Sequence, residues 1–296
     1  MNMRFKSILA GVAGLLCIGH AWAASCEDPK TLRFSVIPDK NLEVRIAEYR
    51  PLIHVMERVL GRRVEVIPAS SYGTVIEGLL AGNIDVAELG PASYAQAKSR
   101  DAGVTAFASP IQRTGPHTDS GSQYASLLVV RRDKGFDSLA RLQGASVSLV
   151  DPASTSGALV PRHAMTALTG MPLERYFGRV TFAGSHDRAI QAVQKGFVDA
   201  AFIASTRLDD ALRSGLVRPD ELSVRWKSVP LPNDPFVYRS QLCPSVVDKI
   251  KQAFFMENPS LQDMFRRLNT EGFVPVTDEK YQEIRRIYQC PLGNAC

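Results

Sequence analysis

The spacing of hydrophobic residues changes repeatedly between a period of two and a period near 3.6. Apolar and polar residues alternate from Leu32 to Val36, which predicts a strand over residues 31–37. Apolar side chains recur every three or four positions over residues 42–60, which predicts a helix with a break or kink near Pro51. The same patterns predict strands at 64–67, 84–89, 124–131, 145–150, 180–183 and 198–203, and helices at 73–81, 157–169, 187–195, 206–214, 244–257, 260–268 and 278–288. This alternation indicates an α/β fold with mostly parallel sheets.

One stretch of the sequence is echoed 114 residues later. Residues 75–87 and 189–201 share Ile, Gly, Asp and Ala at matching positions. Each copy is predicted to be a helix ended by glycine and followed by a buried strand that begins after an aspartate. The echo favours two lobes of one architecture. The alternative is coincidence between two generic helix–Gly–strand units.

Three predicted helix starts carry polar groups suited to an anion. The echo aligns the helix start at Ser71 and Tyr72 with the one at Ser185 and His186. A third start, at residues 151–157, has three consecutive hydroxyl residues, Ser154, Thr155 and Ser156. Free N–H groups and hydroxyl donors at helix N-termini bind oxyanions. Plain helix capping is the alternative, and it needs only one of the three hydroxyls.

The composition and the N-terminus restrict the class of protein. A chain of 296 residues that is 45% hydrophobic and 22% charged is neither disordered, fibrous nor a multi-span membrane protein. Residues 1–23 combine a basic start, a short apolar run and an Ala-Trp-Ala cleavage site, which predicts a signal peptide. An anchor helix is one alternative to cleavage. A lipid-modified start at Cys26 is another, although Ala23 stands where a large aliphatic residue is usual.

The net charge and the cysteines limit the kinds of partner and bond that we expect for this chain. Cleavage after residue 23 removes two basic residues and leaves 33 basic against 30 acidic ones, a net charge of +3. The Arg-Arg pairs are dispersed and lack interleaved aromatics, so we expect no nucleic-acid binding. No Cys or His spacing suits a metal, and we expect no metal or cofactor. Two disulfides are expected, in any of three pairings of the four mature cysteines, which are Cys26, Cys243, Cys290 and Cys296.

A series of motifs, in order and spacing, resembles the periplasmic phosphonate- and phosphite-binding proteins of bacterial ABC importers. The resemblance covers about residues 31–276. The motifs are SYGTVI at 71–76, GNIDVA at 82–87 followed by Gly90 and Pro91, Tyr124 before SLLVV at 126–130, DPASTSG at 151–157 with Val160 and Pro161, GSHD at 184–187, WKS at 226–228 and PNDP at 232–235.

The resemblance implies the two-lobed, type II-like fold of periplasmic binding proteins. Each lobe would be a mostly parallel sheet flanked by helices. Residues 24–125 would begin the first lobe, residues 126–230 would form the second, and residues 231–296 would return to the first. Two crossing segments, near 124–130 and 228–238, would form the hinge.

The resemblance also implies a ligand site. The hydroxyls would donate to a phosphorus oxyanion, His186 would donate from a neutral or protonated ring, and Asp234 would accept from a protonated ligand oxygen or an amine. The implied ligand-binding residues are Tyr72, Tyr124, Ser154, Thr155, Ser156, His186 and Asp234. Their alternatives are packing for the two tyrosines, helix capping for His186 and a turn for Asp234.

The chain departs from the family at one point. Family members that bind aminophosphonates carry a second carboxylate after the strand that matches residues 198–203. Here residues 203–206 hold none, and the first acid is Asp209. This departure favours phosphite, methylphosphonate or phosphate over 2-aminoethylphosphonate.

Three functions compete. The leading hypothesis is a monomeric, non-catalytic solute receptor that delivers its ligand to an inner-membrane ABC permease. A sensor for a membrane kinase would use the same site. A hydrolase with Ser154 or Ser156 as nucleophile and His186 as base is the third, but the G-x-S-x-G and S-x-x-K contexts are absent at these serines.

Overall fold

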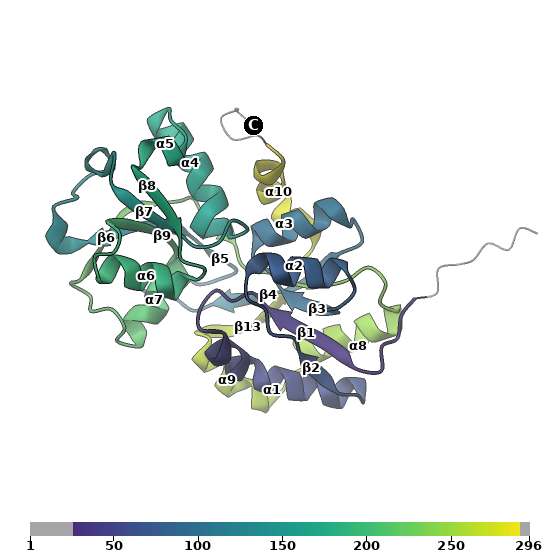
Figure 1. Ribbon diagram of the computed structural model, residues 1–296. Helices are drawn as coiled ribbons and strands as arrows, with labels where there is room; N and C mark the ends of the chain where they lie inside the picture. The colour runs from purple at the N-terminus through teal and green to yellow at the C-terminus, as the bar shows by residue number, and fades with distance from the viewer. Residues whose placement is uncertain (1–25, 291–296) are drawn as a thin grey trace, which may run out of the picture.

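The computed structural model describes residues 26–290, and within them the strands form two main sheets that belong to separate lobes (Figure 1). The predicted signal peptide at 1–23 and Cys296 lie outside the described residues. Within the described range, no helix is long and apolar enough to cross a membrane.

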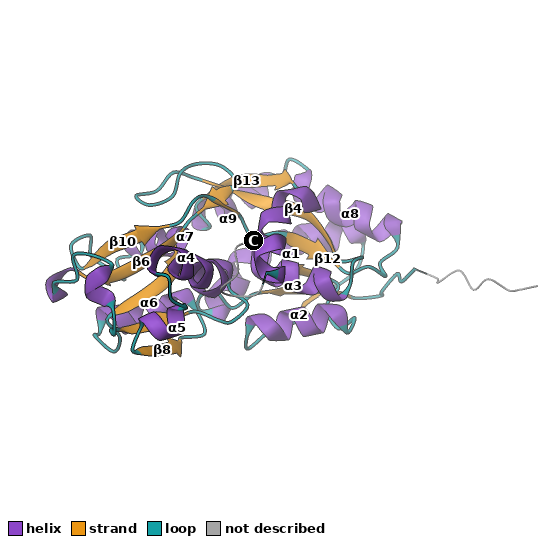
Figure 2. Cartoon of the chain, turned by 90° about the horizontal axis from the view of Figure 1, so that it is seen from above, coloured by secondary structure: helices purple, strands orange, loops and turns teal. Residues whose placement is uncertain are grey.

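The first lobe contains a six-stranded sheet with helices on both faces (Figure 2). Its strand order is β13-β4-β12-β3-β1-β2, with bounds β1 Leu32–Val36, β2 Val64–Val66, β3 Val86–Glu88, β4 Thr105–Gln112, β12 Phe236–Tyr238 and β13 Thr270–Pro275. The helices α2 (Tyr72–Leu80) and α3 (Pro91–Arg100) cover one face. The helices α1 (Leu42–Leu60), α8 (Pro244–Phe255) and α9 (Gln262–Arg267) cover the other.

The second lobe repeats this layering around a five-stranded sheet. The strand order is β10-β6-β9-β7-β8, with bounds β6 Ser126–Arg131, β7 Ser146–Leu149, β8 Arg179–Phe182, β9 Ala200–Ala204 and β10 Leu222–Lys227. The helices α4 (Val160–Thr169) and α5 (Leu173–Tyr176) pack on one face, and α6 (His186–Gln194) and α7 (Ser205–Arg213) on the other. The C-terminal helix α10 (Gln282–Gln289) packs on α3 of the first lobe.

The two lobes are joined by a short antiparallel ribbon. β5 (Gln123–Tyr124) pairs with β11 (Leu231–Pro232), so the outgoing and returning crossings lie side by side. The predicted lobe boundaries, between residues 125 and 126 and between residues 230 and 231, remain predictions.

The prediction of mostly parallel sheets is wrong, because both sheets are mixed. β1 pairs in parallel with β2 and β3, and β7 pairs in parallel with β8 and β9. However, β12 is antiparallel to both of its neighbours, β3 and β4, and β6 is antiparallel to both β9 and β10. The reason is topological. β12 and β6 each come directly from the hinge ribbon and therefore run outward, whereas the strands beside them end at the inter-lobe side. β13 is also antiparallel to its neighbour β4, but it reaches the sheet from α9.

Several local predictions need correction. α1 continues through Pro51 without a break, because buried residues on both sides of the proline, Tyr49 and Leu52 among them, hold it against the sheet. The sequence patterns missed α3, whose buried side chains are mostly small, such as Ala92 and Ala95. Small residues give a weak periodic signal. The strands β4, β10, β12 and β13 were missed as well.

One disulfide ties the start of the described chain to the returning segment. Cys26 is bonded to Cys243, which caps the start of α8. This is one of the pairs that the sequence allowed. Cys290 is also disulfide-bonded. The Cys26–Cys243 disulfide therefore adds a covalent bond to the packing that holds the returning segment in the first lobe.

Candidate functional site

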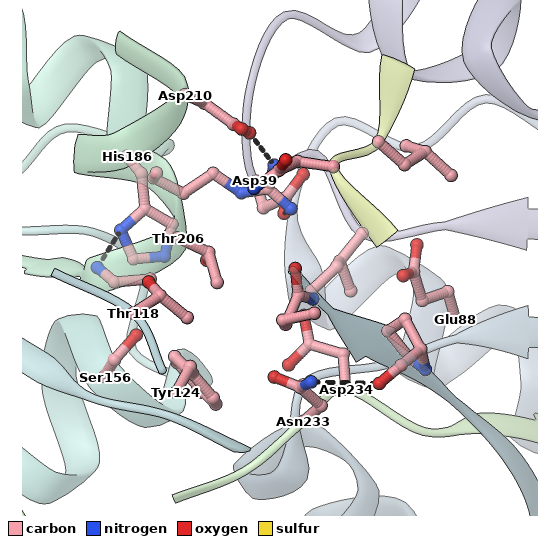
Figure 3. A pocket seen from close by; sticks show the side chains of 18 of the residues that line it. Asp39, Glu88, Thr118, Tyr124, Ser156, His186, Thr206, Asp210, Asn233 and Asp234 are labelled. Carbon is pink, nitrogen blue, oxygen red and sulfur yellow. Dashed lines mark hydrogen bonds and ion pairs between the residues drawn. The ribbon is translucent and has the colours of Figure 1, made fainter. Parts of the chain in front are cut away.

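A pocket between the two lobes is lined by all seven predicted site residues. Figure 3 labels Tyr124, Ser156, His186 and Asp234 among them. The walls of the pocket come from the carboxyl ends of β1, β3 and β4 in the first lobe and from residues after β7 and β9 in the second. The cavity measures about 40 Å³. A single water needs roughly 10–15 Å³ on this measure, so the pocket suits a guest of a few heavy atoms.

The predicted hydroxyl loop begins a turn of π-helix. Residues Thr155–Leu159 form this turn, and Ser154 caps it by accepting a hydrogen bond from the Gly157 N–H at 3.1 Å. The capping interpretation is therefore correct for Ser154. π-Turns inside helices occur often at functional sites, because they widen one turn and redirect its side chains. Here the wider turn places Ser154, Thr155 and Ser156 on the pocket wall together.

Thr155 and Asp234 converge although they come from opposite sides of the pocket. A Cβ atom on Gly90 would lie 3.4 Å from Thr155 Oγ1 and 3.8 Å from Asp234 Oδ1. Glycine at this position lets both polar groups approach. Thr155 Oγ1 also accepts a hydrogen bond from the Ala92 N–H at 2.8 Å, so the hydroxyl links the lobes while its proton remains available to another acceptor.

His186 is fixed as a neutral donor. Its Nδ1 accepts a hydrogen bond from the Ala204 N–H at 3.1 Å, which places the ring proton on Nε2. Burial lowers the pKa of His186 to about 3, against a smaller opposing effect from Asp39. Of the two roles considered for this ring, the protonated one is therefore excluded near neutral pH.

The two tyrosines that line the pocket are both buried. Tyr72 is the first residue of α2, and Tyr124 lies in the hinge ribbon. Burial raises the pKa of each phenol, so both stay protonated and can donate. The Ser156 and Thr155 hydroxyls lower the pKa of Tyr124, but burial has the larger effect.

Asp234 lies just before β12 and lines the pocket. Burial, together with the charges of Glu88 and Asp39, raises its pKa to about 8. Near neutral pH the group therefore carries a proton that it can share with a ligand oxygen. The preceding Asn233 donates to the Pro110 carbonyl at 3.0 Å, which holds this turn in place.

The two equivalent helix starts do face the pocket, but their first N–H groups have protein partners. The Tyr72 N–H points to Asp151 Oδ2 across the lobes at 3.4 Å, and the His186 N–H donates to the Asp39 carbonyl at 2.9 Å. These donors join the lobes in this structure. The side chains at the same positions are the groups that line the cavity.

The pocket also holds charged residues that the sequence analysis missed. They are Asp39, Arg45, Glu88, Arg113, Arg207 and Asp210. Asp39 and Glu88 stand at the carboxyl ends of two predicted neighbouring strands, which is the position where α/β proteins place binding groups. That rule would have identified them. Arg207 follows β9, the strand after which the sequence analysis considered only a second carboxylate.

Carboxyl groups outnumber guanidinium groups around the cavity. Asp209 adds a further acid whose Oδ2 is buried without a partner among residues 26–290, and burial raises its pKa. Five carboxyl groups, with Asp234, thus face three arginines. Asp234 is protonated near neutral pH and the pKa values of Glu88 and Asp209 are raised as well, so these groups carry less negative charge than their number implies. No cluster of metal-ligating side chains occurs in the described part of the chain.

Comparisons with known proteins identify the family. Residues 34–281 match the family model described as "ABC transporter, phosphonate, periplasmic substrate-binding protein". The chain is 32% identical to the phosphate-import protein PhnD of Mycolicibacterium smegmatis, over 90% of this chain and 88% of that protein. It is 30% identical to the phosphonates-binding periplasmic protein of Escherichia coli, over 97% and 82%. A crystal structure of a binding protein component of an ABC phosphonate transporter from Pseudomonas aeruginosa superposes with a TM-score of 0.77 at 26% identity, covering 88% of this chain and 86% of that one.

Proposed function

Since the chain belongs to the phosphonate-binding family of periplasmic ABC-transporter substrate-binding proteins, we propose that its inter-lobe pocket captures a small phosphorus oxyanion. The captured ligand would be handed to an inner-membrane permease. The resemblance found in the sequence is confirmed at the level of family and fold. The roles of the seven site residues are part of this proposal.

The observation that carries the proposal is a set of neutral donors converging on a small cavity. His186 offers Nε2–H, and the hydroxyls of Ser154, Thr155, Tyr72 and others line the same space. Neutral donors satisfy oxyanion oxygens without a full counter-charge, and each hydrogen bond to a charged group contributes about 1.5–3 kcal/mol. Several such bonds are enough for micromolar affinity, which is about −8.2 kcal/mol.

The acid-rich wall makes the proposal more specific. Asp234, protonated near neutral pH, would donate its proton in a hydrogen bond to an oxygen of the ligand. The small cavity favours phosphite, methylphosphonate or phosphate. 2-Aminoethylphosphonate is the competing ligand, because Asp209 provides a buried, unpartnered oxygen within the described residues for an ammonium group.

Titration calorimetry with these four compounds tests the proposal, with sulfate as the anion that carries no proton at neutral pH. We expect micromolar or tighter binding of at least one phosphorus compound and no product release. Thr155→Ala should weaken that binding by about 1–3 kcal/mol. Thr155→Ser, which keeps the hydroxyl, is the matched control. Absence of binding by all four compounds, or equal affinities for Thr155→Ala and the wild type, would contradict the proposal.

Catalysis is not part of the proposal. A histidine whose pKa lies at about 3 is a weak general base at neutral pH, and Ser154 is engaged as a helix cap. A sensor for a membrane kinase would need the same capture step. Uptake of the bound compound by cells with and without the gene distinguishes transport from sensing.

We propose export to the periplasm by the signal peptide at 1–23, in a form without a lipid anchor. Lipid attachment would need the Cys26 sulfur, and this sulfur is bonded to Cys243. Mass spectrometry of the mature protein checks both points.

A further inference from the structure

Five charged side chains of alternating sign cross the pocket wall from one lobe to the other. Glu88 Oε2 lies 2.7 Å from Arg45 Nη2, and Arg45 Nε lies 3.4 Å from Asp39 Oδ1. Asp39 Oδ2 lies 2.7 Å from Arg207 Nη2, and Arg207 Nη1 lies 2.7 Å from Asp210 Oδ2. Figure 3 shows Asp39 and Asp210 approaching from opposite sides of the pocket. The first three residues belong to the first lobe and the last two to the second.

The Asp39–Arg207 pair is the link that crosses between the lobes. Asp39 follows β1, and Arg207 lies in the first turn of α7. The Asp39 side chain is 3% exposed and the Arg207 side chain 12% exposed, so water screens their attraction little. Burial alone would raise the pKa of Asp39, but Arg207 and Arg45 outweigh it and lower the pKa to about 2. The pair is therefore fully ionised at neutral pH.

Each partner keeps a second partner inside its own lobe. When the lobes separate, Asp39 retains Arg45 and Arg207 retains Asp210. A buried ion pair that loses one member usually leaves an uncompensated charge, which is costly. Here an opposite charge remains within 3.4 Å of each group, which reduces that cost, so the bond between the lobes can break and re-form.

We propose that Asp39 and Arg207, which both line the pocket, act as a reversible electrostatic latch that holds the closed form over the ligand. This proposal rests on the proposed function only for the identity of the captured ligand. Asp39 also helps to position His186, because the Asp39 backbone carbonyl accepts a hydrogen bond from the His186 N–H at 2.9 Å. Closure of the latch therefore brings the helix that carries His186 against the first lobe.

Single-molecule energy transfer between the lobes tests the latch. Glu65 in β2 and Arg175 in α5 are exposed residues of opposite lobes, and cysteines at these positions accept the dyes under non-reducing conditions. Arg207→Gln and Asp39→Asn should each shift the ligand-free protein toward longer distances. With methylphosphonate as the probe, each should raise Kd on the order of 10-fold, chiefly through faster dissociation.

Two comparisons separate a latch from general damage. Arg218→Gln removes another lobe 2 guanidinium, whose ion pair with Glu221 lies within one lobe, and should change neither distance nor Kd. The double variant Asp39→Asn/Arg207→Gln should lose no more affinity than the weaker-binding single variant. Additive losses in the double variant, or single variants within twofold of the wild type in both Kd and closed fraction, would overturn the latch.

The latch and the proposed function fail in different ways. If the wild type binds none of methylphosphonate, phosphite, phosphate and 2-aminoethylphosphonate, the proposed function fails. The ligand-free distance distribution then decides the latch: a shift in both variants supports it, and an unchanged distribution rejects it.

Discussion

The two lobes contain one structural unit twice, α2 with β3 in the first and α6 with β9 in the second. Ser71 and Ser185 cap the helices in the same way, each accepting a hydrogen bond from the N–H three residues on. Gly82 and Gly196 end them with φ of 72° and 73°, a left-handed conformation that favours glycine. The repeat seen in the sequence is thus a repeat in structure and not a coincidence.

The units differ in what the repeated aspartate holds. Both side chains accept an N–H from the neighbouring parallel strand, Asp85 from Arg33 at 2.7 Å and Asp199 from Ser146 at 2.8 Å. The Asp199 carboxylate also accepts a hydrogen bond from the Ser146 hydroxyl. Asp85 instead binds two guanidinium groups, those of Arg33 and Arg239.

This difference follows from how each lobe is assembled. The strands of the second lobe are one continuous stretch of chain, whereas the first lobe adds strands after the chain returns through the hinge. Arg239 follows the returning strand β12 and also binds Glu27 at 2.6 Å. Asp85 therefore joins separate segments of the first lobe, a task that Asp199 does not have.

The largest expected effect comes from breaking that junction. Asp85→Ala removes the buried carboxylate partner of the Arg239 guanidinium and leaves it only the exposed Glu27 carboxylate, so it should lower the free energy of unfolding by up to about 3–5 kcal/mol. Urea denaturation followed by circular dichroism measures this loss.

Asp199→Ala is the matched control in the other lobe. It removes hydrogen bonds but orphans no charge, so the loss should be only about 1–3 kcal/mol. Equal losses in the two variants would mean that the ion pairs of Asp85 add nothing to the shared strand contact.

An effect of intermediate size is expected from the first residues of α6 and α2, because only the first residue of α6 should make the stability depend on pH. The folded pKa of His186 lies at about 3, below its usual value near 6.5, so the unfolded chain binds a proton that the folded protein does not. This contribution to stability is complete above pH 6.5 and is lost as the pH falls toward 3. His186→Gln should reduce the loss between pH 6.5 and pH 5 by about 2 kcal/mol in urea denaturation.

Tyr72 occupies the equivalent position and stays neutral over this range. Tyr72→Phe should therefore leave the pH slope unchanged. A variant His186→Gln with the wild-type slope would show that the ring does not carry the effect.

The smallest expected effect is shared by the two units. Ser71→Ala and Ser185→Ala each remove a helix cap, and each should cost about 1 kcal/mol in thermal or urea unfolding. Ser→Thr at the same positions keeps the cap and serves as the control. A difference of more than about 1 kcal/mol between the two alanine variants would indicate that one serine does more than cap its helix.

The residue pattern predicted the repeated unit and most elements, because these depend on local signals: caps at Ser71 and Ser185, glycine stops and runs of buried residues. The set of seven residues that meet at the pocket was implied by the resemblance to the family. The motifs then identified the family through their order along the chain. The roles of the seven residues in binding remain predictions.

Only the tertiary structure decided the mixed pairing of the sheets and the charge chain through Asp39 and Arg207. It also decided that His186 is neutral and that Asp234 holds a proton near neutral pH. Strand direction depends on where the hinge delivers the chain, and ionisation depends on which groups from distant segments share a dry space. Neither property is local, because both arise only when residues far apart in the chain come within a few ångströms of one another.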